Sequence, residues 1–162
     1  MATVYLGLGS NIDPEENLRI GVRELRRRFG DVVLSDIYQS AAVGFDGADF
    51  LNLVVRLESS DTAANIHEQI EAIHKMTGRL PGKEKYSSRP LDIDLLLFDD
   101  LVINAAPLRL PRPDILEYSF VLRPISEIAP DLIHPETGQT LADHWRAYDE
   151  ASHPLTPVWF IL

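Results

Sequence analysis

The 162-residue chain contains no cysteine, which excludes a disulfide framework, a thiolate nucleophile and a cysteine metal site. It also lacks an apolar run long enough to span a bilayer, and its N-terminus lacks the basic and then apolar segments of a signal peptide. Positive charge is scarce: 15 Lys and Arg face 25 Asp and Glu, giving a net charge of −10 that disfavours nucleic-acid binding. We therefore expect a cytoplasmic protein that binds neither membranes nor nucleic acids.

The composition is that of an ordinary globular protein, with 45% hydrophobic and 25% charged residues. On folding, a chain of this length buries about 70% of the surface that its unfolded form exposes, and this burial is enough to form one core. The sequence has no internal repeat and no low-complexity tract. We expect a single domain over residues 1–162.

The apolar periodicity predicts the element order β-α-β-β-α-β. The expected strands lie at 3–9, 32–42, 50–58 and 89–98, and the expected helices lie between Asp13 and Gly30 and between Thr62 and Gly78. Asp13 is expected to cap the first helix, and the apolar face of the second contains Ile66, Ile70, Ile73 and Met76. Residues 101–103 are a possible hairpin partner of the last strand, and short helices are expected near 118–125 and 140–148. This order predicts an α+β, ferredoxin-like sandwich, an antiparallel sheet with helices packed on one face.

The last of these strands carries two acids among apolar neighbours, Asp92 and Asp94. Because successive strand side chains point to opposite faces, both acids share one face, about 6.5–7 Å apart along the backbone. Their carboxylates can straddle two divalent cations about 3.5–4 Å apart, the arrangement used in two-metal displacement at phosphorus. Alternatively, Arg89 or a neighbouring lysine neutralises the acids at a sheet edge without any metal.

A basic loop precedes this strand. Residues 78–89 are rich in Gly, Pro and Ser and contain Arg79, Lys83, Lys85 and Arg89. A cationic loop beside a metal-ready acid pair suits a polyphosphate, whose oxygens need metals and Arg or Lys donors. The alternative is a solvated basic turn. This loop and the Gly-containing segment 43–49 are expected to be mobile until the polyphosphate and its metal ions bind.

Four motifs in order identify a family resemblance from Val4 to about Trp145. They are Gly9-Ser10-Asn11 with Asn17-Leu18, Phe50-Leu51-Asn52, Arg89-x-Leu91-Asp92-x-Asp94, and Pro124-Ile125-x-Glu127-Ile128-Ala129-Pro130. With these motifs the chain resembles the 6-hydroxymethyl-7,8-dihydropterin pyrophosphokinases of folate biosynthesis, which transfer pyrophosphate from ATP to a pterin alcohol. The resemblance implies a ferredoxin-like monomer with ATP as co-substrate and two Mg²⁺ ions.

The resemblance also implies roles for individual residues. Asp92 and Asp94 would hold both Mg²⁺ ions, and catalysis would depend on them together with Arg79 and Arg89. The implied ATP-binding residues are Arg79, Lys83, Tyr86, Arg89, Leu95, Arg109 and Arg112. The implied pterin-binding residues are Ser40, Ala41, Val43, Phe50, Asn52 and Phe120, with the two phenyl rings sandwiching the pterin. Ordinary core packing is the alternative for Phe50 and Phe120, whereas a buried amide such as Asn52 needs hydrogen-bonding partners.

The chain departs from the family pattern at several positions of the nucleotide site. In the basic loop, Pro81 replaces an arginine, Tyr86 replaces a tryptophan, and Ser87-Ser88 replaces a Gly-Pro pair. Before the loop, His74 replaces an acid. After the acidic strand, Pro111-Arg112-Pro113 replaces Pro-His-Tyr, and Tyr118 replaces an arginine. Losing one charge-assisted phosphate contact costs about 1.5–3 kcal/mol. Two other functions therefore stay open: a diverged enzyme acting on another heterocyclic alcohol, and a non-catalytic pterin- or nucleotide-binding protein. The joint presence of Arg89, Asp92 and Asp94 favours an enzyme.

Overall fold

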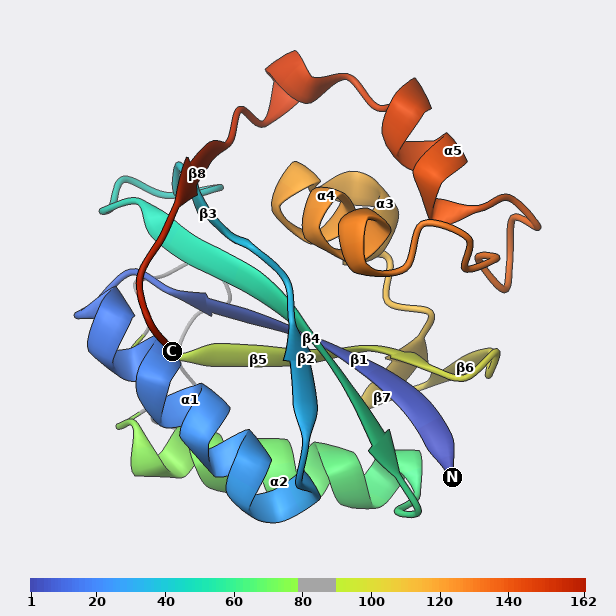
Figure 1. Cartoon of the computed structure of the whole chain (residues 1–162), viewed down its shortest axis with the longest axis horizontal. Coiled ribbons are helices and arrows are strands. Elements are labelled where there is room, and N and C mark those ends of the chain that lie inside the picture. Colours follow the sequence, from blue (N-terminus) through green and yellow to red (C-terminus); the bar gives the residue numbers. More distant parts are fainter. Residues whose placement is uncertain (79–89) are drawn as a thin grey trace.

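A computed structural model describes residues 1–78 and 90–162, and it contains an antiparallel sheet with the strand order β5-β1-β4-β3-β8, with β2 also paired to β4 (Figure 1). The strands of this sheet are β1 (Ala2–Ser10), β2 (Val32–Leu34), β3 (Ile37–Ser40), β4 (Phe50–Ser59), β5 (Asp92–Phe98) and β8 (Thr156–Val158). A separate hairpin is formed by β6 (Ile103–Ala105) and β7 (Leu108–Leu110). The predicted ferredoxin-like architecture is observed.

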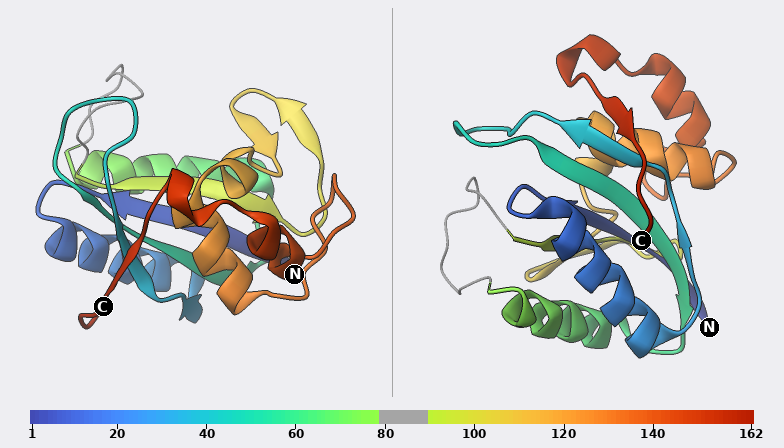
Figure 2. Two further views of the ribbon diagram at one scale, coloured as in Figure 1. Left: turned by 90° about the horizontal axis from the view of Figure 1, so that it is seen from above. Right: turned by 60° about the vertical axis from the view of Figure 1, so that its left-hand side comes forward.

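Helices cover both faces of the sheet (Figures 1 and 2). The long helices α1 (Pro14–Phe29) and α2 (Ala63–Met76) lie on one face, as predicted. Three further helices, α3 (Asp114–Glu117), α4 (Ser119–Ile128) and α5 (Leu141–Ala147), lie on the opposite face, and a 3-10 turn at Glu150–Ser152 leads to β8. In the described parts of the chain, none of these helices combines the length and apolarity that a membrane crossing requires.

The termini of the long helices follow the expected sequence signals, with one exception. Pro14 begins α1, and Gly30 ends it with a φ of 82° that a residue with a side chain rarely adopts. Thr62 caps α2, because its Oγ1 accepts a hydrogen bond of 3.1 Å from the backbone N–H of Asn65. Asp13 occupies the N-cap position of α1, but its φ is 41° and its side chain makes no capping bond. The prediction that Asp13 caps through its carboxylate is therefore wrong.

Three other local predictions are corrected. The expected strand 32–42 is divided into β2 and β3 because the Ser35 hydroxyl replaces a backbone group as acceptor for the N–H of Val54, at 2.8 Å. Residues 101–103 do not pair with the acidic strand, since β6 pairs with β7. Met76 is 54% exposed rather than part of the buried face of α2.

Two apolar clusters hold the layers together. The first lies between the sheet and α1 and α2, where Leu8, Leu18, Ile70 and Ile93 are nearly inaccessible. The second lies between the sheet and α3–α5, and its sheet residues are Tyr5, Val54, Leu96 and Leu97. These four sheet residues all come from β1, β4 and β5 and mark the part of this face that the three C-terminal helices cover.

Candidate active site

A pocket of about 560 Å³ lies on the sheet face that carries α3–α5. Its walls come from β1, β4 and β5, from the segment after β3, and from α3 and the start of α4. The lining residues are Gly7, Leu8, Gly9, Ser40, Ala41, Val43, Phe45, Phe50, Asn52, Leu53, Asp92, Asp94, Leu96, Arg112, Asp114, Glu117, Tyr118, Phe120 and Val121. Apolar walls with a few polar groups are typical of a small-molecule site.

The floor of the pocket is made of strand backbone at Gly7 and Gly9. Gly9 lies opposite Asn52 on β4 and opposite Asp92 on β5. Gly7 likewise lies between β4 and Asp94. Because directly paired residues point to the same face, the two glycines leave a bare strip between Asn52 and the acids. Glycine inside a strand often marks a close approach of a ligand to the backbone.

A methyl group on this floor is expected to impair ligand binding. A Cβ at Gly9 would lie 3.3 Å from Oδ1 of Asn52, so Gly9→Ala must displace the amide or occupy ligand space. We expect Gly9→Ala to weaken pterin binding by roughly 10-fold, about 1.4 kcal/mol, as measured by calorimetry. Gly21→Ala is a control for a tight contact away from the pocket, since its Cβ would lie 3.1 Å from Leu91 under α1. Unchanged pterin affinity in Gly9→Ala would show that no ligand reaches this floor.

Asp92 and Asp94 form the wall on the β5 side. Both carboxylates are partly exposed and line the pocket. Ile93 between them is 2% exposed and packs on the face of the sheet that α1 and α2 cover. The described residues contain no group of three or more His or acidic side chains that could hold a metal. Mg²⁺, however, commonly uses only one or two carboxylates, with waters and substrate phosphates as its other ligands. The two acids therefore fit Mg²⁺ that arrives with a nucleotide.

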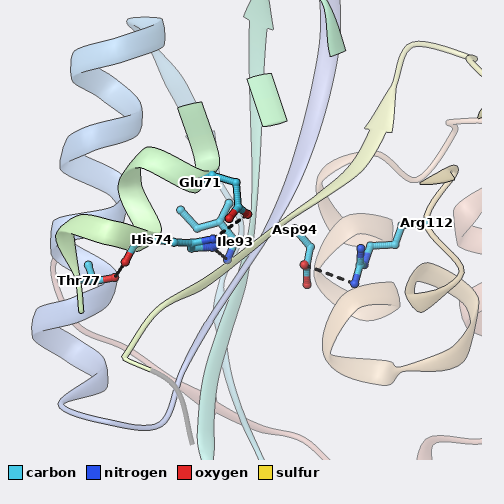
Figure 3. A network of polar contacts seen from close by, with 6 residues as sticks. All are labelled: Glu71, His74, Thr77, Ile93, Asp94 and Arg112. Atoms are coloured by element: carbon cyan, nitrogen blue, oxygen red, sulfur yellow. Dashed lines mark hydrogen bonds and ion pairs between the residues drawn. The ribbon is translucent and has the colours of Figure 1, made fainter. Parts of the chain in front are cut away.

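Arg112 lies beside these acids and pairs with one of them (Figure 3). Its Nη2 is 3.4 Å from Oδ1 of Asp94, and its Nε is 3.3 Å from Oδ2 of Asp114. Burial by itself would lower the pKa of Arg112, but the two carboxylates outweigh burial and raise the pKa above its ordinary value. The guanidinium therefore stays charged and supplies positive charge to the acid wall.

A strand irregularity places Arg112 there. Tyr5 pairs with Leu97 and Leu6 pairs with Leu95, which leaves Leu96 without a partner residue on β1. The free carbonyl of Leu96 accepts a hydrogen bond of 2.9 Å from the backbone N–H of Arg112. Such bulges often occur beside active sites, where they redirect a side chain or end the pairing.

Asn52 forms the opposite wall and is 5% exposed. Its Nδ2 donates to the carbonyl of Tyr38 at 3.1 Å and to Oγ of Ser40 at 2.9 Å. Both amide hydrogens are thereby used within the protein, and no described residue donates to Oδ1. The amide is thus fixed in an orientation that offers an acceptor above Gly9.

Contacts with α4 fix Tyr38 of β3, whose carbonyl accepts a hydrogen bond from Asn52. The Tyr38 hydroxyl donates to the Glu127 carboxylate, and the Arg123 guanidinium lies 4.6 Å from the centre of the Tyr38 ring. Burial, together with the Glu127 charge, raises the pKa of Tyr38 well above its ordinary value, so the hydroxyl remains a donor. The contacts of the Tyr38 side chain therefore also fix the Tyr38 carbonyl, which accepts the hydrogen bond from Asn52.

Aromatic rings line the pocket in two pairs. Phe45 meets Phe50 edge to face, with centroids 6.3 Å apart. Tyr118 stacks on Phe120 at 5.0 Å with an interplanar angle of 13°. Each ring predicted to sandwich a pterin is thus supported by a second ring, which limits its rotation.

The segment that carries Phe45 is anchored at its C-terminal end. Nδ2 of Asn11 donates to the carbonyl of Ala48 at 3.1 Å, and Nε2 of Gln39 donates to Asp49 at 2.9 Å. Asn11 therefore supports the segment that borders the pocket. The expected mobility of 43–49 in the free protein stays a prediction.

The structure brings most of the predicted site residues together. All six predicted pterin contacts line the pocket, as do Asp92, Asp94 and Arg112, although their roles remain predictions. Arg109 lies instead in a neighbouring hollow beside β6 and β7, which Arg112 also borders. Leu95 does not line the pocket, because its side chain packs on the face of the sheet that α1 and α2 cover. Leu96 lines the pocket in its place. The remaining predicted or altered positions, Arg79, Pro81, Lys83, Tyr86, Ser87, Ser88 and Arg89, lie outside the described residues.

Sequence reasoning missed several lining residues. Gly7 had a usable signal, since a glycine inside an apolar strand is unusual. Phe45 and Asp114 had none, because their approach to the pocket depends on a loop and on the path after the β6–β7 hairpin. Tyr118 is a departure from the family pattern in the sequence, and in the structure its ring stacks on Phe120.

The chain is similar to known proteins over most of its length. The model of the family described as 7,8-dihydro-6-hydroxymethylpterin-pyrophosphokinase (HPPK) matches residues 5–130. The chain is 36% identical over 137 residues to 2-amino-4-hydroxy-6-hydroxymethyldihydropteridine pyrophosphokinase of Aquifex aeolicus, covering 83% of this chain and 85% of the relative. It is 37% identical over 142 residues to the Porphyromonas gingivalis protein of the same name, covering 84% and 96%.

Among solved structures, wild-type HPPK-DHPS of Plasmodium falciparum is similar, with a TM-score of 0.75 and 12% identity. The match covers 91% of this chain and 44% of the longer Plasmodium chain, and at this identity it supports the fold alone. The predicted fold class is thereby confirmed. The family model and the identity to full-length relatives go further: the chain belongs to the 7,8-dihydro-6-hydroxymethylpterin-pyrophosphokinase family.

Proposed function

We propose that the chain transfers pyrophosphate from ATP to 6-hydroxymethyl-7,8-dihydropterin in folate biosynthesis, releasing AMP. Family membership supports this activity. The structural observation that carries it is a single pocket in which Asn52 and the acids Asp92 and Asp94 face each other across Gly9. One wall suits the hydrogen-bonding edge of a flat heterocycle, and the other suits a metal-bound polyphosphate.

The aromatic rings and Asn52 would orient the acceptor. Phe50 and Phe120 provide apolar ring faces, and Oδ1 of Asn52 accepts a hydrogen bond from a ring or amino N–H of the pterin. The neighbouring carbonyl and N–H groups near Ala41 and Val43 complete the polar edge. Holding the reactants in a fixed orientation removes much of the entropic barrier to their reaction.

The transfer itself needs little side-chain chemistry. The hydroxymethyl oxygen of the pterin forms a bond to the β-phosphorus, the bond from that phosphorus to the α–β bridging oxygen breaks, and AMP leaves. The hydroxyl proton passes to solvent. Asp92 and Asp94 would hold two Mg²⁺ ions, whose charge stabilises the attacking and leaving oxygens. The protein contributes positioning and charge neutralisation, as in other phosphoryl transfers.

Arg112 is a candidate phosphate ligand whose guanidinium pairs with two carboxylates in the structure. Its present partners, Asp94 and Asp114, are acids, and Asp94 would receive Mg²⁺ in the complex. The guanidinium would then turn to a phosphate oxygen. We expect Arg112→Gln to weaken binding of a nonhydrolysable ATP analogue with Mg²⁺ by roughly 10-fold and to leave pterin binding unchanged, as measured by calorimetry.

A control for Arg112→Gln is Arg109→Gln, which removes the same charge from the neighbouring hollow. The sequence also predicted a nucleotide contact for Arg109, and the structure places it farther from the acids. A smaller effect than that of Arg112→Gln is therefore expected. Equal losses in both variants would indicate a general effect of charge rather than a contact with phosphate.

An AMP-formation assay tests the proposed function. We expect AMP and pterin pyrophosphate in equal amounts, with formation requiring ATP, the reduced pterin and Mg²⁺ together. Absence of AMP above the blank at saturating substrates would contradict the proposal. AMP formation only with another heterocyclic alcohol would favour a diverged acceptor, and tight binding of both substrates without turnover would favour a binding protein.

We also propose that residues 1–162 act as one domain, as a monomer, in the cytoplasm. The pocket supports the monomer because residues of a single copy form all of its described walls. Light scattering on the purified chain is expected to give the mass of one copy, with and without substrates. A dimer mass at working concentration would contradict this.

A further inference from the structure

His74 belongs to α2 and lies on the opposite side of β5 from Asp94 (Figure 3). It is 3% exposed, although imidazole is a polar group. Its Nε2 accepts a hydrogen bond of 2.9 Å from the backbone N–H of Ile93. Ile93 is the residue between Asp92 and Asp94, so this bond holds the backbone at the centre of the acid pair.

The position of β5 in the sheet explains why this bond matters. β5 is the first strand in the order, and within residues 1–78 and 90–162 it pairs only with β1. In an antiparallel pair, every second residue directs its N–H and C=O away from the partner strand. The N–H of Ile93 points toward α2 instead, and His74 gives it an acceptor in a buried place.

A second contact holds the imidazole, and a further hydrogen bond holds the backbone of His74. Its Nδ1 lies 3.2 Å from Oε1 of Glu71, one helical turn earlier. Because Nε2 accepts from Ile93, the proton of the neutral ring is on Nδ1, which donates to Glu71. Thr77 Oγ1 donates to the His74 carbonyl at 3.1 Å. Figure 3 shows these groups on the α2 side of β5, opposite Asp94 and Arg112.

We infer that His74 is a positioning residue for the acid pair. By fixing the N–H of Ile93, it fixes the local direction of β5 and thus the separation and aim of the Asp92 and Asp94 carboxylates. Arg112 acts on the same strand from the pocket side through Asp94 and the Leu96 carbonyl. The inference rests on the proposed function in that the ligand received by the acids is Mg²⁺ with a nucleotide.

The property required at position 74 is a hydrogen-bond acceptor. His74→Leu removes the acceptor and keeps an apolar side chain, whereas His74→Gln keeps an amide oxygen at similar reach. Ile66→Val is the matched control, because it removes a methylene group from a fully buried residue of α2 that makes no hydrogen bond to β5. Each variant is compared with the native chain by calorimetry, amide hydrogen exchange and turnover.

His74→Leu is expected to weaken binding of Mg²⁺ with a nonhydrolysable ATP analogue by roughly 10–100-fold, as for other groups that orient metal ligands. Pterin affinity is expected to stay within about twofold, and exchange at the Ile93 amide is expected to accelerate. His74→Gln is expected to restore nucleotide affinity to within about threefold of native. Ile66→Val is expected to lower the melting temperature without separating the two affinities.

Native nucleotide affinity in His74→Leu would overturn the inference. So would a purely structural defect, in which the affinities for both ligands and the melting temperature fall together. Failure of His74→Gln to restore nucleotide affinity would also overturn it. Absence of Mg²⁺–nucleotide binding by the native chain would overturn it as well. If the native chain binds both ligands but forms no AMP, the proposed function fails, and the separation of affinities still decides the role of His74.

Discussion

Asp94→Ala is expected to lower kcat by roughly 10³-fold while leaving pterin affinity within about twofold. This loss is expected because Asp94 is the proposed Mg²⁺ ligand beside the phosphates, where the charge of the transition state would develop. Pterin affinity should be spared because the proposed pterin-binding groups, Asn52 and the aromatic rings, line other parts of the pocket. Single-turnover AMP formation and calorimetry with the pterin measure the two effects separately.

Asp100→Ala is the matched control for Asp94→Ala. It removes the same charge from an exposed residue in the turn that follows β5, outside the pocket. We expect its kcat to stay within about twofold of native. Retention of more than about a tenth of native kcat by Asp94→Ala would show that this carboxylate is not a ligand of an essential metal.

Phe120→Ala is expected to have the opposite pattern, with pterin affinity reduced roughly 10–100-fold and Mg²⁺–nucleotide affinity unchanged. Stacking of a heterocycle on an aromatic side chain contributes about 1–3 kcal/mol, which corresponds to this range. The ring of Phe120 is already oriented by its stacking on Tyr118 at 5.0 Å, so little order has to be imposed when the ligand binds. Calorimetry with each ligand alone measures both affinities.

Two controls separate the ring of Phe120 from its bulk and from general stability. Phe120→Leu keeps apolar bulk without an aromatic face and should lie between native and Phe120→Ala. Phe160→Ala removes a phenyl ring that packs beside Arg19 at the far side of the sheet and should leave both affinities unchanged. Equal pterin affinity of native, Phe120→Leu and Phe120→Ala would remove Phe120 from the pterin site.

The central part of the fold and site could be predicted because its signals are local. Strand alternation places Asp92 and Asp94 on one face with no knowledge of the partner strands. Helical spacing and the stop signals at Gly30 and Gly78 bound α1 and α2 closely. The element order then limits the topology to very few arrangements.

The remainder depends on contacts between distant segments. The pairing of Arg112 with Asp94 requires the irregularity at Leu96 and the β6–β7 hairpin, and neither has a sequence signature. β8 joins the sheet beside β3 from the C-terminal segment, where proline residues obscure a strand pattern. The C-terminal helices cover only part of the second sheet face, and the pocket exists because of that limit.

The role of His74 also could not be read from the sequence. An isolated histidine on an apolar helix face is equally consistent with packing, catalysis or metal binding. Its meaning appears only when the N–H of Ile93 is seen 2.9 Å from its Nε2. At this position, where the family pattern has an acid, His74 thus supplies a hydrogen-bond acceptor to the backbone between Asp92 and Asp94.

A crystal structure with Mg²⁺, a nonhydrolysable ATP analogue and the pterin tests the central claim most directly. We expect carboxylate oxygens of Asp92 and Asp94 about 2.0–2.1 Å from metal ions that also touch the phosphates, with the pterin between Phe50 and Phe120. Both carboxylates bonded only to protein cations such as Arg112, with no ion density beside them, would contradict the account.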